Sequence, residues 1–342
     1  MIETLEYDRV RSMDVRLKKQ ATLHFKMNLT RNYYDYNHII CEQEVILVCD
    51  RYEKMNKMKV INCLKRQRSA KWKIEIYGSL GFNKFNAVFR KCKARQVASL
   101  TVIAVSEGTQ IPSAALKRLM TSVAHSKNSV FQSATFEDFK ITSSIISPLQ
   151  AVKLENLSLI TCNMLPRDIT VLSVYQSWWK LKSLDLNQSK LGNLGAEILA
   201  GNTSWIVLEK LVLSSNEIGA KGAEQLAMNK TWRLLKLLNL TDNRIGDEGV
   251  SAIASNTTWG SLETLFLSRN EITDVGAVKL AENKAWKELK TLYLSYNKIE
   301  DKGLESIISN GSWKSLQTIY ILYNWLTVPI YLETKLIIRT GK

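Results

Sequence analysis

The sequence predicts an α/β solenoid in which parallel strands line a concave side and helices cover a convex side. Three regularities support this prediction. A tryptophan recurs every 27 residues, a leucine and asparagine pattern follows each tryptophan, and small and apolar residues at helical spacing follow that pattern. Self-similarity at one fixed period is typical of repeat architectures, because each repeat is one supersecondary unit.

The tryptophans set the register of the repeats. Three residues after each of them stands a leucine, which begins the pattern L-x-x-L-x-L-x-x-N-x-I/L. The six positions are Trp178, Trp205, Trp232, Trp259, Trp286 and Trp313. One such unit cannot bury its apolar face alone, so we expect neighbouring units to stack around one continuous core.

The leucine pattern predicts a short strand in every unit. Four consecutive units match it at every position, beginning at Leu208, Leu235, Leu262 and Leu289. Looser copies begin at Leu154, Leu181 and Leu316, and the first two carry Cys162 and Ser189 at the asparagine position. We expect the asparagine amides to bridge backbone groups of adjacent coils in a buried ladder, where losing one costs roughly 1–3 kcal/mol.

The segment after each strand predicts a helix that packs closely on the sheet. Its pattern, G-x-x-G-A-x-x-L-A-x-N, is best preserved in Gly219, Gly222, Ala223, Leu226, Ala227 and Asn229. Small residues permit a close approach, and apolar residues four apart mark the inward face. We interpret the closing asparagines, such as Asn229 and Asn256, as left-handed helix stops. The tryptophans are expected to be structural wedges between a helix end and the next strand.

These motifs resemble the ribonuclease-inhibitor-like class of leucine-rich-repeat proteins, over about half of the chain. The resemblance implies a horseshoe whose strands line the concave side. The recurrent N-x-x-W before each strand also looks like repeat proteins of host-associated intracellular bacteria and some protists. Some proteins of this fold act on GTPases, and some bacterial ones carry a separate ubiquitin-ligase domain, but no recognisable catalytic module of either kind stands in this sequence.

Four segments are expected along the chain. Residues 1–95 form a basic N-terminal α/β head with strands at Glu44–Cys49 and Trp72–Tyr77, and residues 96–150 hold degenerate repeats or an N-terminal cap. Residues 151–328 carry the repeats, and residues 329–342 form a C-terminal tail. The net charge is +15 and the pI about 9.5. Residues 1–95 hold 21 of the 47 basic and 10 of the 32 acidic residues, a net +11.

A predicted helix near residues 51–68 concentrates this positive charge. Its candidate anion-binding residues are Lys54, Lys57, Lys65, Arg66 and Arg68. A basic amphipathic helix can lie on an anionic membrane or track the phosphates of a nucleic acid. The alternative, which we favour, is a solvated helix face whose apolar side packs on its own domain.

The predicted strands leave alternate residues free on the concave surface, where a partner would bind. The column between the second and third leucines turns from polar residues to aromatic ones toward the C-terminus. The candidate partner-binding residues are Phe266, Arg269, Tyr293, Tyr296, Tyr320, Tyr323 and Trp325. Tyr, Trp and Arg are enriched at interface hot spots. The alternative is that aromatic residues favour strands and cover the last coils.

Catalytic and metal-binding patterns are missing from the sequence. The three histidines, His24, His38 and His125, lie in no catalytic or metal motif, and no phosphate-binding glycine pattern occurs. Five cysteines without metal spacing indicate free thiols in a reducing compartment. Neither a secretory signal nor a membrane helix is visible. We therefore expect no catalytic residue, metal or small-molecule cofactor, and a cytoplasmic protein or one delivered into a host cell by a signal-independent route.

The function that these observations predict is a non-catalytic scaffold that binds a protein through the concave face of the repeats. One alternative is an enzyme, or a regulator of a GTPase or the ubiquitin pathway, with its active part in the first 150 residues. Another is docking of the basic head to a membrane or a nucleic acid, which we favour less.

Overall fold

The computed structural model describes residues 25–28, 44–49, 71–77, 97–103, 113–124, 131–138, 141–174, 178–327 and 337–339. The chain divides into two compact units, residues 1–138 and 139–342. The basic segment with Lys54, Lys57, Lys65, Arg66 and Arg68 lies outside the described residues, so its predicted helix and its anion-binding role stay predictions.

The first unit contains five strands and one helix among its described residues. The strands are β1 (Phe25–Asn28), β2 (Glu44–Cys49), β3 (Lys71–Tyr77), β4 (Val97–Ile103) and β5 (Ser133–Glu137), and the helix is α3 (Ser113–Ala124). Strand β1 pairs antiparallel with β2, whereas β2 to β5 pair in parallel. The two strands predicted in the N-terminal region are therefore confirmed, and β4, α3 and β5 follow the strand–helix–strand order of a repeat.

The second unit is a parallel sheet with a helix after almost every strand. Its strands are β6 (Asn156–Ile160), β7 (Ser183–Asp185), β8 (Lys210–Val212), β9 (Leu237–Asn239), β10 (Thr264–Phe266), β11 (Thr291–Tyr293), β12 (Thr318–Tyr320) and β13 (Ile337–Arg339). From β6 to β12, paired residues are 27 positions apart, as in Leu265 opposite Leu292. The repeat period is therefore also the register of the sheet.

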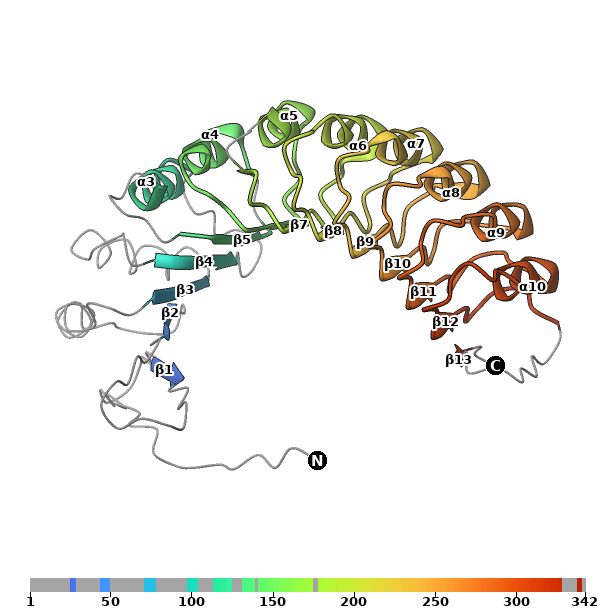
Figure 1. Ribbon diagram of the computed structural model, residues 1–342. Helices are drawn as coiled ribbons and strands as arrows, with labels where there is room; N and C mark the ends of the chain where they lie inside the picture. Colours follow the sequence, from blue (N-terminus) through green and yellow to red (C-terminus); the bar gives the residue numbers. More distant parts are fainter. Residues whose placement is uncertain are drawn as a thin grey trace. The chain divides into compact units, whose positions relative to one another are not determined.

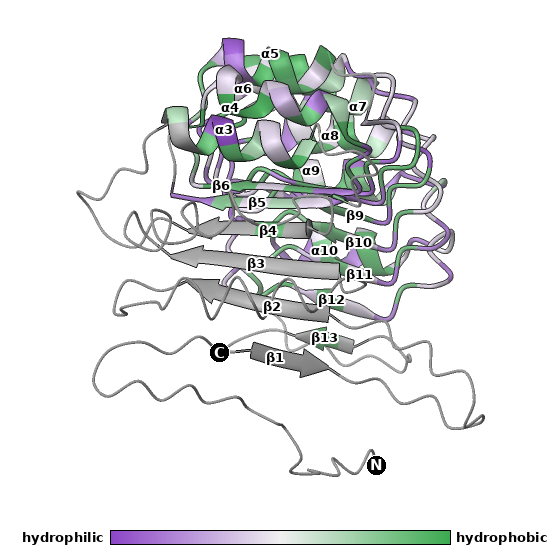
Figure 2. Cartoon of the chain, turned by 90° about the vertical axis from the view of Figure 1, so that its left-hand side faces the viewer, coloured by the Kyte–Doolittle hydropathy of each residue, from purple (hydrophilic) through white to green (hydrophobic). Residues whose placement is uncertain are grey.

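The helices of this unit lie on the side of the strands away from the inner face of the arc (Figure 1). They are α4 (Ser143–Ile146), the 3₁₀ helix η2 (Ser147–Ala151), α5 (Pro166–Val174), α6 (Gly192–Ala200), α7 (Ala220–Met228), α8 (Gly246–Ser255), α9 (Asp274–Ala281) and α10 (Asp301–Ile308). Figure 2 shows hydrophilic and hydrophobic residues on the same helices, as in amphipathic helices that cover a sheet. The predicted solenoid of inner strands and outer helices is confirmed.

The core of the second unit is built from the repeated leucines and tryptophans. In β7, β9, β10, β11 and β12 the middle residue is buried and its two neighbours are half-buried. All six repeat tryptophans are buried, and the rings of Trp286 and Trp313 stack with centroids 6.2 Å apart. The tryptophans are therefore interior packing residues, as predicted.

The predicted asparagine ladder is present. The Oδ1 of Asn243 accepts the backbone N–H groups of Asn216 (3.1 Å) and Ile218 (2.9 Å) in the preceding repeat. Its Nδ2 donates to the carbonyls of Leu213 (3.0 Å) and Leu240 (2.9 Å). One buried side-chain amide thus bonds to backbone groups of two neighbouring coils. These backbone groups have no partner within a strand or a helix.

The prediction of left-handed helix stops was wrong. Asn229 (φ −70°, ψ 120°) and Asn256 (φ −74°, ψ 112°) are extended. The Nδ2 of Asn256 donates to the carbonyls of Ala227 (2.7 Å) and Asn229 (3.1 Å), and its Oδ1 accepts the N–H of Thr258 (2.8 Å). Asparagine stands here because its amide bridges two coils, and not because its backbone tolerates a positive φ.

Several helices are capped by the repeat before them. Asp247 at the start of α8 accepts the N–H groups of Thr273 (2.8 Å) and Gly276 (3.0 Å) at the start of α9. Asp274 accepts those of Glu300 and Gly303 in the same way. A Cβ at Gly276 would collide with the Asp247 carboxylate. This glycine is therefore required by the cap of the neighbouring repeat.

Candidate partner-binding face

The concave face is defined here as the side of strands β6 to β12 that is turned away from the helices. Because side chains alternate along a strand, the residues that flank each buried leucine point to this face. The predicted partner-binding residues all lie on β10, β11, β12 or the bends that follow them. Six of the seven form two stacked columns, and Trp325 belongs to neither.

The first aromatic column consists of Phe266, Tyr293 and Tyr320. The rings of Phe266 and Tyr293 stack with centroids 4.1 Å apart and planes 9° apart. Those of Tyr293 and Tyr320 lie 4.4 Å apart with planes 2° apart. Burial raises the pKa of the Tyr293 phenol, and the adjacent Tyr320 raises it further. The three rings are half-buried by one another, so little side-chain freedom remains in them.

The second aromatic column consists of Arg269, Tyr296 and Tyr323, each directly before a ladder asparagine. The guanidinium carbon of Arg269 lies 3.9 Å from the ring centroid of Tyr296, a cation–π contact. The rings of Tyr296 and Tyr323 stack at 4.4 Å. All three residues have a φ between 55° and 57°, which the bend of the repeat requires. Bulky residues seldom adopt such a φ.

The C-terminal end of this surface is the most exposed. Tyr323 is 62% exposed, Trp325 is 58% exposed and Tyr296 is 43% exposed. Exposed large aromatic side chains on a rigid sheet are a feature of protein-binding surfaces, since water is released from apolar area when a partner covers them.

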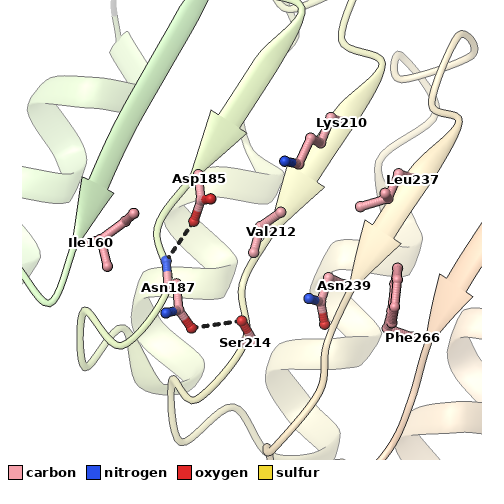
Figure 3. A pocket seen from close by; sticks show the side chains of 9 residues that line it. All are labelled: Ile160, Asp185, Asn187, Lys210, Val212, Ser214, Leu237, Asn239 and Phe266. Carbon is pink, nitrogen blue, oxygen red and sulfur yellow. Dashed lines mark hydrogen bonds between the residues drawn. The ribbon is translucent and has the colours of Figure 1, made fainter. Parts of the chain in front are cut away.

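A polar hollow of about 330 Å³ lies on the same face beside the first aromatic column (Figure 3). The residues that line it come from β6 to β10 and the bends after them. They are Ile160, Asp185, Asn187, Lys210, Val212, Ser214, Leu237, Asn239 and Phe266. Phe266 therefore belongs to both the hollow and the first aromatic column. Sequence reasoning placed four of these residues in one column but did not identify a hollow.

The side chains of the hollow are held by short hydrogen bonds. Asp185 Oδ1 accepts the N–H of Asn187 (3.1 Å), and Asn187 Oδ1 accepts the hydroxyl of Ser214 (2.7 Å). Asn239 Oδ1 accepts the N–H of Thr241 (2.9 Å). Burial raises the pKa of Asp185, whereas the Asn187 N–H and the charge of Lys210 oppose that shift. Asp185 is thus a partly desolvated acid near a cation.

Charges of alternating sign flank the concave face on one side. They stand at the position after the first leucine of each repeat, in the order Glu155, Lys182, Glu209, Lys236, Glu263 and Lys290. Each lysine pairs with the glutamate of the preceding repeat, at 2.9, 2.8 and 2.6 Å. This alternation neutralises the flank and was missed by sequence reasoning. Comparing one position across all repeats would have found it.

The described residues include no group of three or more His, Cys, Asp or Glu residues that could hold a metal ion. In the same part of the chain, no helix is long and apolar enough to cross a membrane. Cys162 is buried, and its Sγ donates to the carbonyl of Ile160 at 3.3 Å. This cysteine stands at the ladder position and is structural.

Comparison with known proteins identifies the repeats. The family model described as Leucine Rich repeat matches residues 206–227, 233–254, 261–281 and 288–307. No curated protein matches the chain. Among solved structures, the yeast Rad7 and Elc1 complex is similar with a TM-score of 0.47 and 15% identity, over 78% of this chain and 73% of that one.

An internalin from Listeria monocytogenes is similar with a TM-score of 0.46 and 15% identity, over 81% of this chain and 86% of that one. The family match gives four leucine-rich repeats between residues 206 and 307, and together with the parallel strand order it makes the second unit a leucine-rich-repeat solenoid.

Proposed function

We propose that this leucine-rich-repeat chain is a non-catalytic scaffold that binds a protein partner through the concave face, over the two aromatic columns and Trp325. The observation that carries the proposal is the pair of parallel stacks, Phe266–Tyr293–Tyr320 and Arg269–Tyr296–Tyr323. None of the same positions in the earlier repeats is aromatic, so the aromatic residues are a local property of β10 to β12 and not of the repeat.

Rigidity supports this role. Binding costs free energy for every side chain that must be ordered, roughly 0.5–1.5 kcal/mol for a flexible one. Stacked rings on neighbouring strands are ordered before a partner arrives. A partner that covers Tyr296 and Tyr323 therefore gains the apolar contact without that cost.

The flanking charges favour a partner of modest charge at this end. Lys290 is paired with Glu263, and Lys298 lies 3.6 Å from Glu271. Arg269 is held over the Tyr296 ring. Contact here would depend on aromatic and hydroxyl groups more than on net charge, so we expect it to persist at raised salt.

Photo-crosslinking in the full-length chain tests the proposal. A benzophenone amino acid replaces Tyr323 on the concave face or, as a matched control, Val275, which is 65% exposed on α9. We expect covalent adducts of a protein partner from position 323 and none from position 275. The Tyr293→Ala, Tyr320→Ala double variant should abolish the adduct at 323 while circular dichroism stays unchanged.

The proposal is overturned if position 275 gives the same adduct as position 323, or if the double variant crosslinks as well as the parent chain. The same proposal includes the ribonuclease-inhibitor-like class, and either a cytoplasmic location or delivery into a host cell by a signal-independent route. The alternatives that place an activity or an anion-binding helix in the first 150 residues stay predictions.

A further inference from the structure

The side chains that line the polar hollow are not residues that the repeat pattern requires. The leucine and asparagine pattern leaves all nine lining positions free to vary, yet charged, amide and apolar side chains from different repeats gather there. Figure 3 shows the ammonium of Lys210 directed toward Asp185 and the amide nitrogen of Asn239 turned toward β8. Val212 lies between them.

The hollow offers both a hydrogen-bond acceptor and donors that internal contacts do not use. The Oδ1 of Asp185 and the Oδ1 of Asn239 accept backbone N–H groups, which leaves Asp185 Oδ2 and Asn239 Nδ2 for a ligand. Among the described residues, Lys210 has no ion-pair partner within 4.0 Å, although its charge lowers the pKa of Asp185. The hollow therefore presents one acceptor, Asp185 Oδ2, and two donors, Lys210 Nζ and Asn239 Nδ2.

The opposite charges of Asp185 and Lys210 disfavour a ligand group of either sign. A ligand carboxylate would meet Lys210 but would be repelled by Asp185. An ammonium or guanidinium would meet Asp185 but would be repelled by Lys210. A neutral group that donates on one side and accepts on the other satisfies both residues without bringing in a net charge.

The apolar side chains of the hollow indicate what the neutral polar group of the ligand is attached to. Val212, Leu237, Ile160 and Phe266 line the hollow beside the polar side chains. A short aliphatic stem would cover them, whereas a bare polar molecule would leave them in contact with water. The ligand is thus expected to have a polar end and an apolar stem.

We propose that the hollow binds a carboxamide group on an aliphatic stem, as in the side chain of glutamine. The amide NH₂ donates to Asp185 Oδ2, the amide oxygen accepts from Lys210 and Asn239, and the stem packs on Val212 and Phe266. This proposal rests on the proposed function in one respect: the glutamine is taken to belong to the protein that binds over the aromatic columns. Binding of a carboxamide in the hollow does not itself require that function.

Methyl NMR of the full-length chain tests this proposal with small probes. N-acetyl-glutamine methylamide is titrated while the methyl signals of Ile160, Val212 and Leu237 are followed. We expect shifts at these three residues with saturation in the millimolar range. The corresponding derivatives of glutamate, lysine and norleucine should bind at least fivefold more weakly. The glycine derivative, which has only main-chain amides, distinguishes side-chain from main-chain binding.

Two variants then change the preference in opposite directions. Asp185→Asn leaves Lys210 alone and should favour the glutamate derivative over glutamine. Lys210→Met leaves Asp185 alone and should favour the lysine derivative. Both substitutions are on the strand surface, and the Asn side chain still accepts the N–H of Asn187. The Val275→Ala variant should bind the glutamine probe as the parent chain does, because Val275 is exposed on α9 and does not line the hollow.

The proposal is wrong if the glutamine probe moves none of the three methyl signals, if the glycine probe binds equally well, or if neither variant changes the order of preference. A partner that crosslinks at position 323 while the glutamine probe does not bind would leave the proposed function standing and overturn only the carboxamide site. If the glutamine probe binds but no partner crosslinks at position 323, the carboxamide site stands and only the proposed function is overturned.

Discussion

Replacing Asn243 by alanine tests the asparagine ladder, on which the stacking of the repeats depends. The substitution removes the acceptor of two backbone N–H groups, those of Asn216 and Ile218, and a donor to the carbonyl of Leu213. Asn216 and Ile218 are fully buried and Asn243 is 5% exposed, so bulk water does not replace the lost contacts.

The magnitude follows from these contacts. A buried polar group left without a partner costs about 1–3 kcal/mol. Two N–H groups lose their acceptor at once, which sums to roughly 2–6 kcal/mol. Because alanine is smaller, a water molecule can enter beside the bend and restore part of this loss. We therefore expect a decrease of about 3 kcal/mol in the free energy of unfolding.

The assay is urea unfolding followed by far-ultraviolet circular dichroism, with hydrogen exchange of the amides of Asn216 and Ile218 as the local measurement. The matched control is Asn239→Ala, which removes an asparagine of the same repeat from the half-buried concave surface. This control should lose less than about 1 kcal/mol. If Asn243→Ala loses no more than the control, or if the two amides keep their protection, the ladder does not hold adjacent coils together.

Three further predictions follow from single contacts. Gly276→Ala should lower stability by about 1–3 kcal/mol by thermal unfolding, because its Cβ meets the Asp247 carboxylate, and adding Asp247→Ala should recover part of the loss. Full stability in the single variant would contradict the inter-repeat cap. Burial raises the pKa of Tyr293, so its phenol should ionise at a higher pH than an exposed tyrosine does, measured by absorbance at 295 nm as the difference from Tyr293→Phe. Since the folded state favours the neutral phenol, this stabilisation is present below the unfolded pKa and is lost as pH rises through the folded one. An ordinary midpoint would show that the ring is not desolvated. Lys290→Glu should cost less than about 1 kcal/mol by placing two acids side by side, and Glu263→Lys in the same chain should restore only part of it, because position 263 also faces Lys236. A loss that salt does not reduce would mean that charge is not its cause.

Much of the second unit was predictable because its regularities are local and repeated. The register of β6 to β12 equals the tryptophan period, and the strand positions, buried tryptophans and asparagine ladder agree with the leucine pattern. Each repeat contacts mainly its neighbours, so one unit specifies the next. The stacking of Tyr293 on Tyr320 could be predicted for the same reason, since the two residues occupy the equivalent position of adjacent repeats.

The repeated pattern was enough to predict the solenoid, its 27-residue register and the column that carries the aromatic residues. The three-dimensional contacts were needed to show that Asn256 is a bridge and not a left-handed stop, and that Asp247 caps the helix of the next repeat. They were also needed to show that Asp185, Lys210 and Asn239 meet in one hollow. The physical reason is that a periodic pattern specifies which backbone positions are adjacent, whereas side-chain conformation and solvent exposure depend on neighbours that belong to no pattern.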